Sequence, residues 1–215
     1  RRGYTESNPF YKFEMPDGRK KVQERIPWSD EDIRRFLTSD FVNKNEFIAT
    51  AIALYTGMRL DEICMLKHKD ISEDLFHIYE GKTKAARRVV PVHRVLKKII
   101  VSNDSDNEEY ILKGLVSAGY DNKRSCNFQK RLGRTRKRLN LPKGVVFHSL
   151  RNTVITKLQN NMIALENIET IVGHAQKSVA LGVYSSGLAV EKVREIINGI
   201  SYGNTIDNLI LNYKI

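Results

Sequence analysis

Short runs of apolar residues at helical spacing, some of them followed by a helix-ending glycine or proline, occupy most of this 215-residue chain. Ser29 introduces the first run and can cap a helix, with Asp32 placed to return the hydrogen bond. The second run covers about residues 46–55 and is followed by Gly57, a residue type that commonly ends helices. Further helices are expected from residue 59 onward and over residues 124–139, 148–159, 164–172 and 188–197. Such a chain buries its apolar faces by packing short helices on one another.

One stretch departs from the helical pattern. Leu75–Tyr79 and Arg88–Val92 have the composition of strands, and the polar residues 80–87 between them predict the turn of a β-hairpin. The expected fold is therefore mainly α with a small antiparallel β-sheet, an α+β domain.

The chain divides into three parts. Residues 1–26 contain prolines and scattered charges without a sustained period, which is typical of a linker or arm. Residues 27–200 are expected to form one domain, because this length suffices for one sizeable core. Residues 201–215 form an amphipathic tail, and the sequence leaves open whether it docks on its own core or on a neighbouring copy.

The net charge of +11 is concentrated between residues 121 and 160, where eleven lysines and arginines accompany a single acidic residue. A concentrated basic segment is typical of proteins that bind a polyphosphate. The alternative is a basic helix that is merely solvated. The candidates for contact with DNA are Lys84, Arg124, Lys130, Arg131, Arg134 and Arg138.

Composition disfavours several other classes of protein. No apolar run approaches the roughly 18 residues of a membrane span, and the chain does not start with a signal-peptide core. Cys64 and Cys126 lie outside any metal-ligand spacing and are expected to be reduced, as in a cytoplasmic protein. The histidines also lack metal-ligand spacing, so neither a metal nor another cofactor is predicted.

Two arginines stand in contexts that suit phosphate chemistry. Arg59 opens a helix just after a glycine, and Glu62 could orient it, although a surface ion pair would explain the same spacing. His148 and Arg151 share one helical face, from which they could bind a phosphate and transfer a proton. Taken alone, each pattern is weak, because such spacings often arise by chance.

A histidine and a tyrosine follow later in the chain. Tyr184 lies ten residues after His174, and by itself it would more often be a packing residue. In combination, the arginines can bind the dispersed negative charge of a phosphate and the imidazoles can move protons. A phenolic oxygen could then attack a phosphodiester.

Four local motifs, taken in order, resemble those of the catalytic domain of tyrosine recombinases, the phage-type integrases. They are Thr56–Ile63, which resembles the first arginine motif; Gly81–Lys84 with Val90–Val92, which resembles the lysine-bearing hairpin; Phe147–Thr153, which resembles the HxLRxT motif; and Ile171–His174 followed by Val183–Tyr184, which resembles the last motif. The resemblance covers about residues 27–200. Ser149 and Asn152 depart from the common acidic residue and histidine at their positions, and the interval of ten residues before Tyr184 exceeds the frequent nine.

The resemblance implies a site-specific recombinase or integrase, of phage or prophage type, that cuts and rejoins DNA without a cofactor. Tyr184 would attack the scissile phosphate and form a 3′-phosphotyrosyl bond. Arg59 and Arg151 would hold the non-bridging oxygens. Lys82 would protonate the departing 5′-oxygen, with Lys84 as the alternative.

Two histidines complete the implied site. His148 would act as acid and base toward the tyrosine, and His174 would hydrogen-bond the phosphate. The resemblance also implies a core-binding domain before residues 1–26, and a homotetramer on double-stranded DNA in the bacterial cytoplasm. Two alternatives remain: DNA relaxation in the manner of a type IB topoisomerase, and a DNA-binding module without catalysis.

Overall fold

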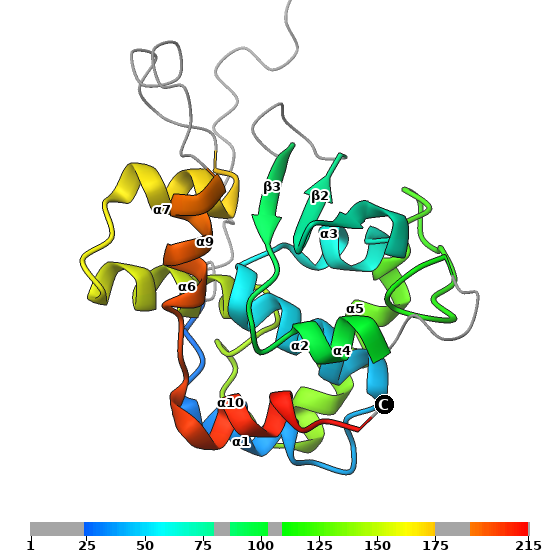
Figure 1. Cartoon of the computed structure of the whole chain (residues 1–215). Helices are drawn as coiled ribbons and strands as arrows, with labels where there is room; N and C mark the ends of the chain where they lie inside the picture. Colours follow the sequence, from blue (N-terminus) through cyan, green and yellow to red (C-terminus); the bar gives the residue numbers. More distant parts are fainter. Residues whose placement is uncertain (1–23, 80–86, 103–108, 175–189, 215) are drawn as a thin grey trace, which may run out of the picture.

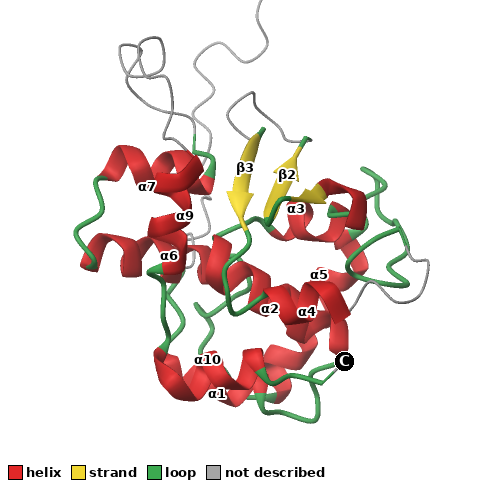
Figure 2. Ribbon diagram, viewed as in Figure 1, coloured by secondary structure: helices red, strands yellow, loops and turns green. Residues whose placement is uncertain are grey.

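The computed structural model describes residues 24–79, 87–102, 109–174 and 190–214. The predicted positions 82, 84 and 184 lie outside these ranges. Helices make up most of the fold and a small sheet lies at one end (Figures 1 and 2). In chain order the elements are α1 (Asp30–Leu37), α2 (Lys44–Thr56), α3 (Leu60–Met65), a 3-10 turn (His68–Asp70), β1 (Ile71–Ser72), β2 (Leu75–Ile78), β3 (Arg88–Pro91), α4 (Lys97–Ser102), α5 (Ser125–Arg138), α6 (Ser149–Asn160), α7 (Leu165–Val172), α9 (Val190–Asn198) and α10 (Gly203–Leu211).

The helix-starting and helix-ending signals of the sequence are confirmed. Ser29 caps α1 by accepting a hydrogen bond from the Asp32 backbone N–H at 3.1 Å, and the Ser29 hydroxyl donates to the Asp32 carboxylate. The second helix begins earlier than expected, at Lys44, because Asn43 and Glu46 form a capping box. Gly57 ends α2 in the left-handed conformation, at φ 65°.

The predicted hairpin strands pair in antiparallel register, with Phe76 opposite Val90 and His77 opposite Val89. A third strand, β1, extends the sheet through Ile71 opposite Phe76. The sequence analysis did not predict it, because a strand of two residues has no readable period. The prediction of a mainly α fold with a small antiparallel sheet is therefore confirmed, and the sheet has one strand more than expected.

Helix α2 forms the centre of the core. All its residues from Glu46 to Thr56 are buried, which is typical of a helix covered on every side. It packs against α6 and α3. From α6, the stripe Leu150, Val154 and Leu158 is fully buried against this core.

The tail lies on the core of its own chain. Helix α10 packs beside α1 at the end of the molecule away from β2 and β3 (Figure 1). The Tyr55 hydroxyl donates to Asp207 at 2.5 Å, and the Tyr202 hydroxyl donates to the Leu54 carbonyl at 2.8 Å. Ile206 and Ile210 are buried in the same core as α2, so the tail continues the domain beyond the expected limit at residue 200.

The residues before α1 are hydrogen-bonded to the segment that precedes α6. Ile26 donates its backbone N–H to the Gly144 carbonyl at 3.1 Å, and the Trp28 indole donates to the Val146 carbonyl at 2.9 Å. A Cβ at Gly144 would lie 2.6 Å from the Glu24 carbonyl oxygen, so this close approach requires glycine. No helix among the described residues is long and apolar enough to span a bilayer.

A buried histidine in this core should make stability depend on pH. His93 is fully buried, accepts from the Val95 backbone N–H on Nδ1 and lies 3.1 Å from the Ile200 carbonyl through Nε2. Burial lowers the pKa of His93 to about 4, more than its contact with Ile200 raises it. The neutral ring is therefore the form that fits.

Because the unfolded chain takes up this proton near pH 6.5 and the folded chain only near pH 4, stability is lost as pH falls through that window. We expect the free energy of unfolding to fall by about 2–3 kcal/mol across it from this group. Urea unfolding at pH 7, 5.5 and 4 measures the fall. In His93→Gln the loss of unfolding free energy between pH 7 and 4 should be smaller by about 2–3 kcal/mol. A pH dependence equal to that of the wild type would contradict the role given to His93.

Candidate active site

The turn between α2 and α3 sets the position of Arg59. Gly57 has a positive φ, and a Cβ on it would lie 3.1 Å from Val172 Cγ1, so only glycine fits comfortably. Arg59 is the N-cap of α3, and its backbone N–H donates to Glu62 Oε2 at 2.8 Å. The guanidinium donates to Glu62 Oε1 at 2.9 Å and, through Nη2, to the Gly173 carbonyl at 2.9 Å. Arg59 is thus held at the meeting point of α2, α3 and the end of α7.

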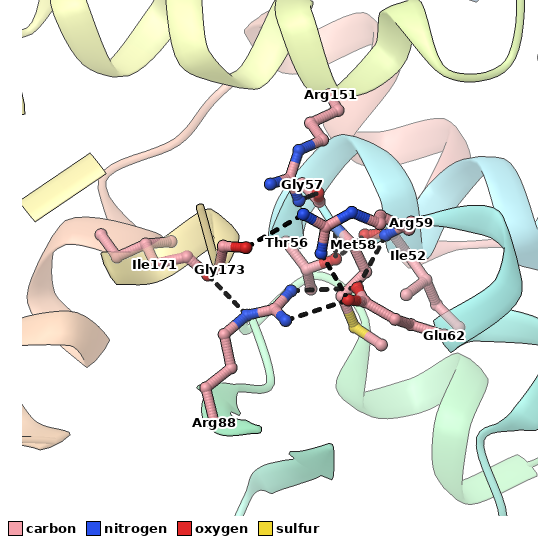
Figure 3. Close-up of polar contacts among 10 residues, drawn as sticks. All are labelled: Ile52, Thr56, Gly57, Met58, Arg59, Glu62, Arg88, Arg151, Ile171 and Gly173. Carbon is pink, nitrogen blue, oxygen red and sulfur yellow. Dashed lines mark hydrogen bonds and ion pairs between the residues drawn. The ribbon is translucent and has the colours of Figure 1, made fainter. Parts of the chain in front are cut away.

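Arg151 reaches the same point from α6, as Figure 3 shows. Its side chain is 2% exposed, and Nη1 donates to the Gly57 carbonyl at 2.8 Å. Nε and Nη2 are buried and have no hydrogen-bond partner within the described part of the chain. A buried guanidinium with two unused donors is costly, because each unsatisfied donor loses its hydration without replacement. This geometry is therefore typical of a site that awaits an anion.

A third arginine, Arg88 at the start of β3, joins the cluster. Its Nη1 and Nη2 donate to the two oxygens of Glu62 at 3.1 and 3.0 Å, and its Nε donates to the Ile171 carbonyl at 2.9 Å (Figure 3). The sequence analysis did not single out Arg88. The only signal was its place at the start of a predicted strand, which says nothing about a partner that lies 26 residues earlier.

Arg59 and Arg88 share the Glu62 carboxylate, and Arg151 beside them hydrogen-bonds no carboxylate among the described residues, so the cluster carries excess positive charge. Burial alone would raise the pKa of Glu62, but hydrogen bonds and charge from Arg88, followed by contacts with Arg59, bring that pKa below its ordinary value. Burial, followed by the charges of Arg59 and Arg88, lowers the pKa of Arg151 to about 9. Arg151 thus remains protonated at neutral pH, next to two cations and with unused donors. An incoming anion would offset the excess positive charge and would accept hydrogen bonds from the unused nitrogens of Arg151.

Two histidines lie at the edge of this cluster. His148 is the N-cap residue of α6 and keeps part of its surface in solvent, while the partial burial of its ring together with the charges of Arg25, Arg151 and Arg59 lowers its pKa. His174 follows Gly173, and burial together with the charges of Arg151 and Arg59 lowers its pKa as well. Both imidazoles are therefore neutral near pH 7, the form that can accept a proton or a hydrogen bond.

A cavity of about 480 Å³ opens beside Arg59 and His148. One wall is a face of α5 formed by Gln129, Gly133 and Arg136, which follow at helical spacing. Arg25 and Lys143 also line it. The cavity thus joins Arg59 to the basic helix. Its lining holds four lysine and arginine side chains against the two carboxylates of Glu24 and Asp61, a net positive balance that suits a polyanion.

The structure places the expected site residues as follows. Arg59, Glu62 and Arg151 come together at the turn after α2 (Figure 3). His148 and His174 lie within range of the charges of Arg59 and Arg151. Lys82, Lys84 and Tyr184 lie outside the described residues, so their expected roles stay predictions.

Among the residues expected to contact DNA, Arg124 already has partners within the protein. Arg124 donates to the carbonyls of Leu112, Leu115 and Cys64 at 3.0, 2.7 and 3.0 Å, and its guanidinium stacks 3.6 Å from the centre of the Tyr110 ring. These contacts hold the loop before α5 and give Arg124 a structural role, while its expected contact with DNA stays a prediction. A charge count along the sequence cannot distinguish a solvated arginine from one already satisfied by carbonyls.

The remaining basic residues of α5 lie on its exposed sides. Lys130 and Arg134 are exposed. Arg131 Nε lies 3.5 Å from Glu46 Oε2, and Arg138 lies 4.1 Å from the centre of the Phe41 ring. The last two belong to a face different from the one that lines the cavity. Arg136 and Lys143 were counted in the basic segment but not named as DNA contacts, and both line the cavity. Nη1 of Arg136 already donates to the Pro142 and Lys143 carbonyls at 3.0 and 3.3 Å.

Sulfate should stabilise the protein through the arginine cluster. An ion that binds only the folded state at ten times its Kd adds about 1.4 kcal/mol, which for this size raises Tm by roughly 3–6 °C. Thermal melts in sodium sulfate and in sodium chloride of equal ionic strength measure the difference. In Arg151→Met the difference should disappear, and an equal shift in that variant would place the ion elsewhere.

The sequence model described as "Phage integrase family" matches residues 31–188. The chain is 32% identical over 179 residues to the tyrosine recombinase XerD of Chlamydia muridarum, covering 74% of this chain and 57% of that protein.

Two solved structures share the fold. The integrase of mycobacterium phage Brujita has a TM-score of 0.63 at 17% identity, covering 97% of this chain and 70% of that one. A lambda integrase tetramer bound to a Holliday junction has a TM-score of 0.57 at 18% identity, covering 77% and 51%. The chain thus spans about half the length of the XerD protein and of the lambda integrase chain. By the match over residues 31–188 and the similarity to XerD, the chain belongs to the phage integrase family.

Proposed function

We propose that this chain is the catalytic part of a site-specific DNA recombinase that cuts and rejoins DNA through a covalent phosphotyrosyl intermediate. One observation carries the proposal: Arg151 is 2% exposed, yet two of its nitrogens have no partner among the described residues, beside the guanidinium of Arg59. A phosphate at this point would satisfy those donors. Family membership favours a recombinase over a type IB topoisomerase.

In the proposed reaction the Tyr184 phenolic oxygen attacks the scissile phosphorus. The new O–P bond forms as the bond from phosphorus to the 5′-oxygen breaks, leaving a 3′-phosphotyrosyl link and a 5′-hydroxyl. His148 accepts the phenolic proton, for which its lowered pKa keeps it neutral. Lys82, or Lys84, donates a proton to the departing 5′-oxygen. Attack by a 5′-hydroxyl of another strand reverses the steps and exchanges the strands.

Arg59 and Arg151 stabilise the charge that builds on the non-bridging oxygens. Their donors are fixed before the substrate arrives, by Glu62 and Gly173 for Arg59 and by Gly57 for Arg151. Such fixed donors cost no rearrangement at the moment of reaction. His174, beside the same arginines, hydrogen-bonds the phosphate.

The proposed substrate is double-stranded DNA, which would lie over the cavity and α5. Arg136 and Lys143 line the cavity, while Lys130 and Arg134 are exposed nearby on the helix. Contacts of this kind position the backbone and weaken steeply with salt. We further propose a homotetramer on DNA, supported by the tetramer in which lambda integrase was solved on a Holliday junction. A DNA substrate, together with relatives from a bacterium and from a bacterial phage, supports a reaction in the bacterial cytoplasm.

A nicked suicide duplex tests the proposal. When a short fragment beyond the cut diffuses away, its 5′-hydroxyl cannot reverse the attack, so the covalent product accumulates. The expected result is a protein–DNA band that survives denaturation and disappears on digestion with protease. Binding without such a band, on duplexes that carry the cognate site of the element, would leave a DNA-binding module instead.

A further inference from the structure

We propose that Arg88 is a positioning residue, which holds Glu62 and the turn at Gly173 and so fixes Arg59 and His174. The inference rests on the proposed function, because it concerns the same phosphate site. The Arg88 guanidinium donates to the Glu62 carboxylate and to the Ile171 carbonyl. It acts through its neighbours.

The first support is the state of the Glu62 carboxylate. It accepts four hydrogen bonds, from the backbone N–H and Nη1 of Arg59 and from Nη1 and Nη2 of Arg88. A carboxylate offers about four acceptor positions, so Glu62 is fully used. Its side chain is 5% exposed and that of Arg88 is 8% exposed, while that of Arg59 is 35% exposed. The more exposed Arg59 is thus oriented by the Glu62 carboxylate, which the buried Arg88 holds in place.

The second support is the end of α7. The Ile171 carbonyl accepts a hydrogen bond from Arg88, and the Gly173 carbonyl accepts one from Arg59. Both arginines therefore hold the same turn. A Cβ on Gly173 would lie 2.7 Å from Arg88 Nη1 and 2.9 Å from Cζ, and φ is +70° at this residue. Glycine is therefore needed both for the turn and for the room that Arg88 occupies. His174 follows directly, so its backbone position depends on this contact.

The third support is the place of Arg88 in the sheet. It begins β3, which pairs with β2, whereas Glu62 belongs to α3 and Gly173 caps α7. One guanidinium thus joins the sheet to two helix ends. Side chains that lock a catalytic group in this way affect rate, because a misplacement of about 1 Å can cost on the order of 10²-fold.

Arg88→Met tests the role. We expect the single-turnover rate of covalent product formation, at saturating nicked DNA, to fall roughly 10- to 100-fold. The Kd for DNA should stay within about threefold, because Arg88 is not part of the proposed DNA surface. Arg88→Lys should recover only part of the rate, since lysine keeps the charge but lacks the planar fork that meets both Glu62 oxygens. The matched control is Arg34→Met, which removes an exposed arginine–glutamate pair from α1 and should keep the wild-type rate.

A double-mutant cycle with Glu62→Gln separates positioning from general stabilisation. If Arg88 acts through Glu62, the double variant should be about as slow as the slower single variant. All rates are measured at least about 15 °C below the Tm of each variant, so that each variant is folded during the measurement. A rate unchanged in Arg88→Met despite a lower Tm would overturn the inference, and so would additive effects. If the wild type forms no covalent product, the proposed function fails and this inference with it, whereas a wild-type product with an unaffected Arg88→Met overturns the inference alone.

Discussion

Replacing Tyr184 with Phe is expected to abolish the covalent protein–DNA product. Phenylalanine has no oxygen with which to form the bond to phosphorus, and loss of a nucleophile typically costs on the order of 10⁴-fold or more. Binding to the nicked duplex should remain near the wild-type level, because one hydroxyl contributes little to a surface of lysines and arginines. The measurement is the denaturation-resistant band, with DNA affinity measured in parallel.

The control for this experiment is Tyr120→Phe. Tyr120 is fully exposed in the loop before α5, so loss of its hydroxyl should leave both binding and covalent product unchanged. A covalent band that persists in Tyr184→Phe would show that another residue is the nucleophile. The order of the sequence motifs would then have led to the wrong tyrosine.

Replacing Arg151 with Met is expected to slow the reaction and to stabilise the protein. Loss of one preorganised contact to the developing charge should cost on the order of 10²–10³ in single-turnover rate. The variant loses one hydrogen bond to the Gly57 carbonyl, but it also removes a buried cation with two unpartnered nitrogens beside two other cations, so the net change should be neutral or stabilising by about 1–2 kcal/mol. Opposite effects on rate and Tm are typical of a functional site that has been kept at the expense of stability.

Arg124→Met provides the matched comparison, since this guanidinium donates to three carbonyls. Its loss leaves three acceptors without a donor and should lower stability by about 1–3 kcal/mol. Thermal or urea unfolding of the two variants measures the contrast. A loss of stability in Arg151→Met as large as that in Arg124→Met would mean that Arg151 serves the fold, and the phosphate site would lose its main support.

The local elements could be read from the sequence because their causes are local. Ser29 with Asp32 starts α1, and Gly57 ends α2 with a positive φ that few other residues adopt easily. The hairpin strands were read from their composition and from the polar turn between them. The same locality explains why Arg59, His148, Arg151 and His174 could be named as candidates, since each stands in a short motif.

Other features were not readable because they depend on long-range contacts. The strand β1 exists only through pairing with β2, and the satisfied state of Arg124 depends on carbonyls up to 60 residues away. Arg88 was missed for the same reason, because Glu62 and Ile171, to which it donates, lie far from it in sequence.

The sequence alone determined the family motifs, most of the helices and the two strands of the hairpin, because caps, periodicity and turn residues act over a few positions. Only the tertiary structure decided which arginines are satisfied by protein and which retain unused donors. Arg124 and Arg151 differ in this respect although both stand in basic, helical sequence. The reason is that a guanidinium's need for an anion depends on burial and on nearby acceptors, and both are properties of the packed chain.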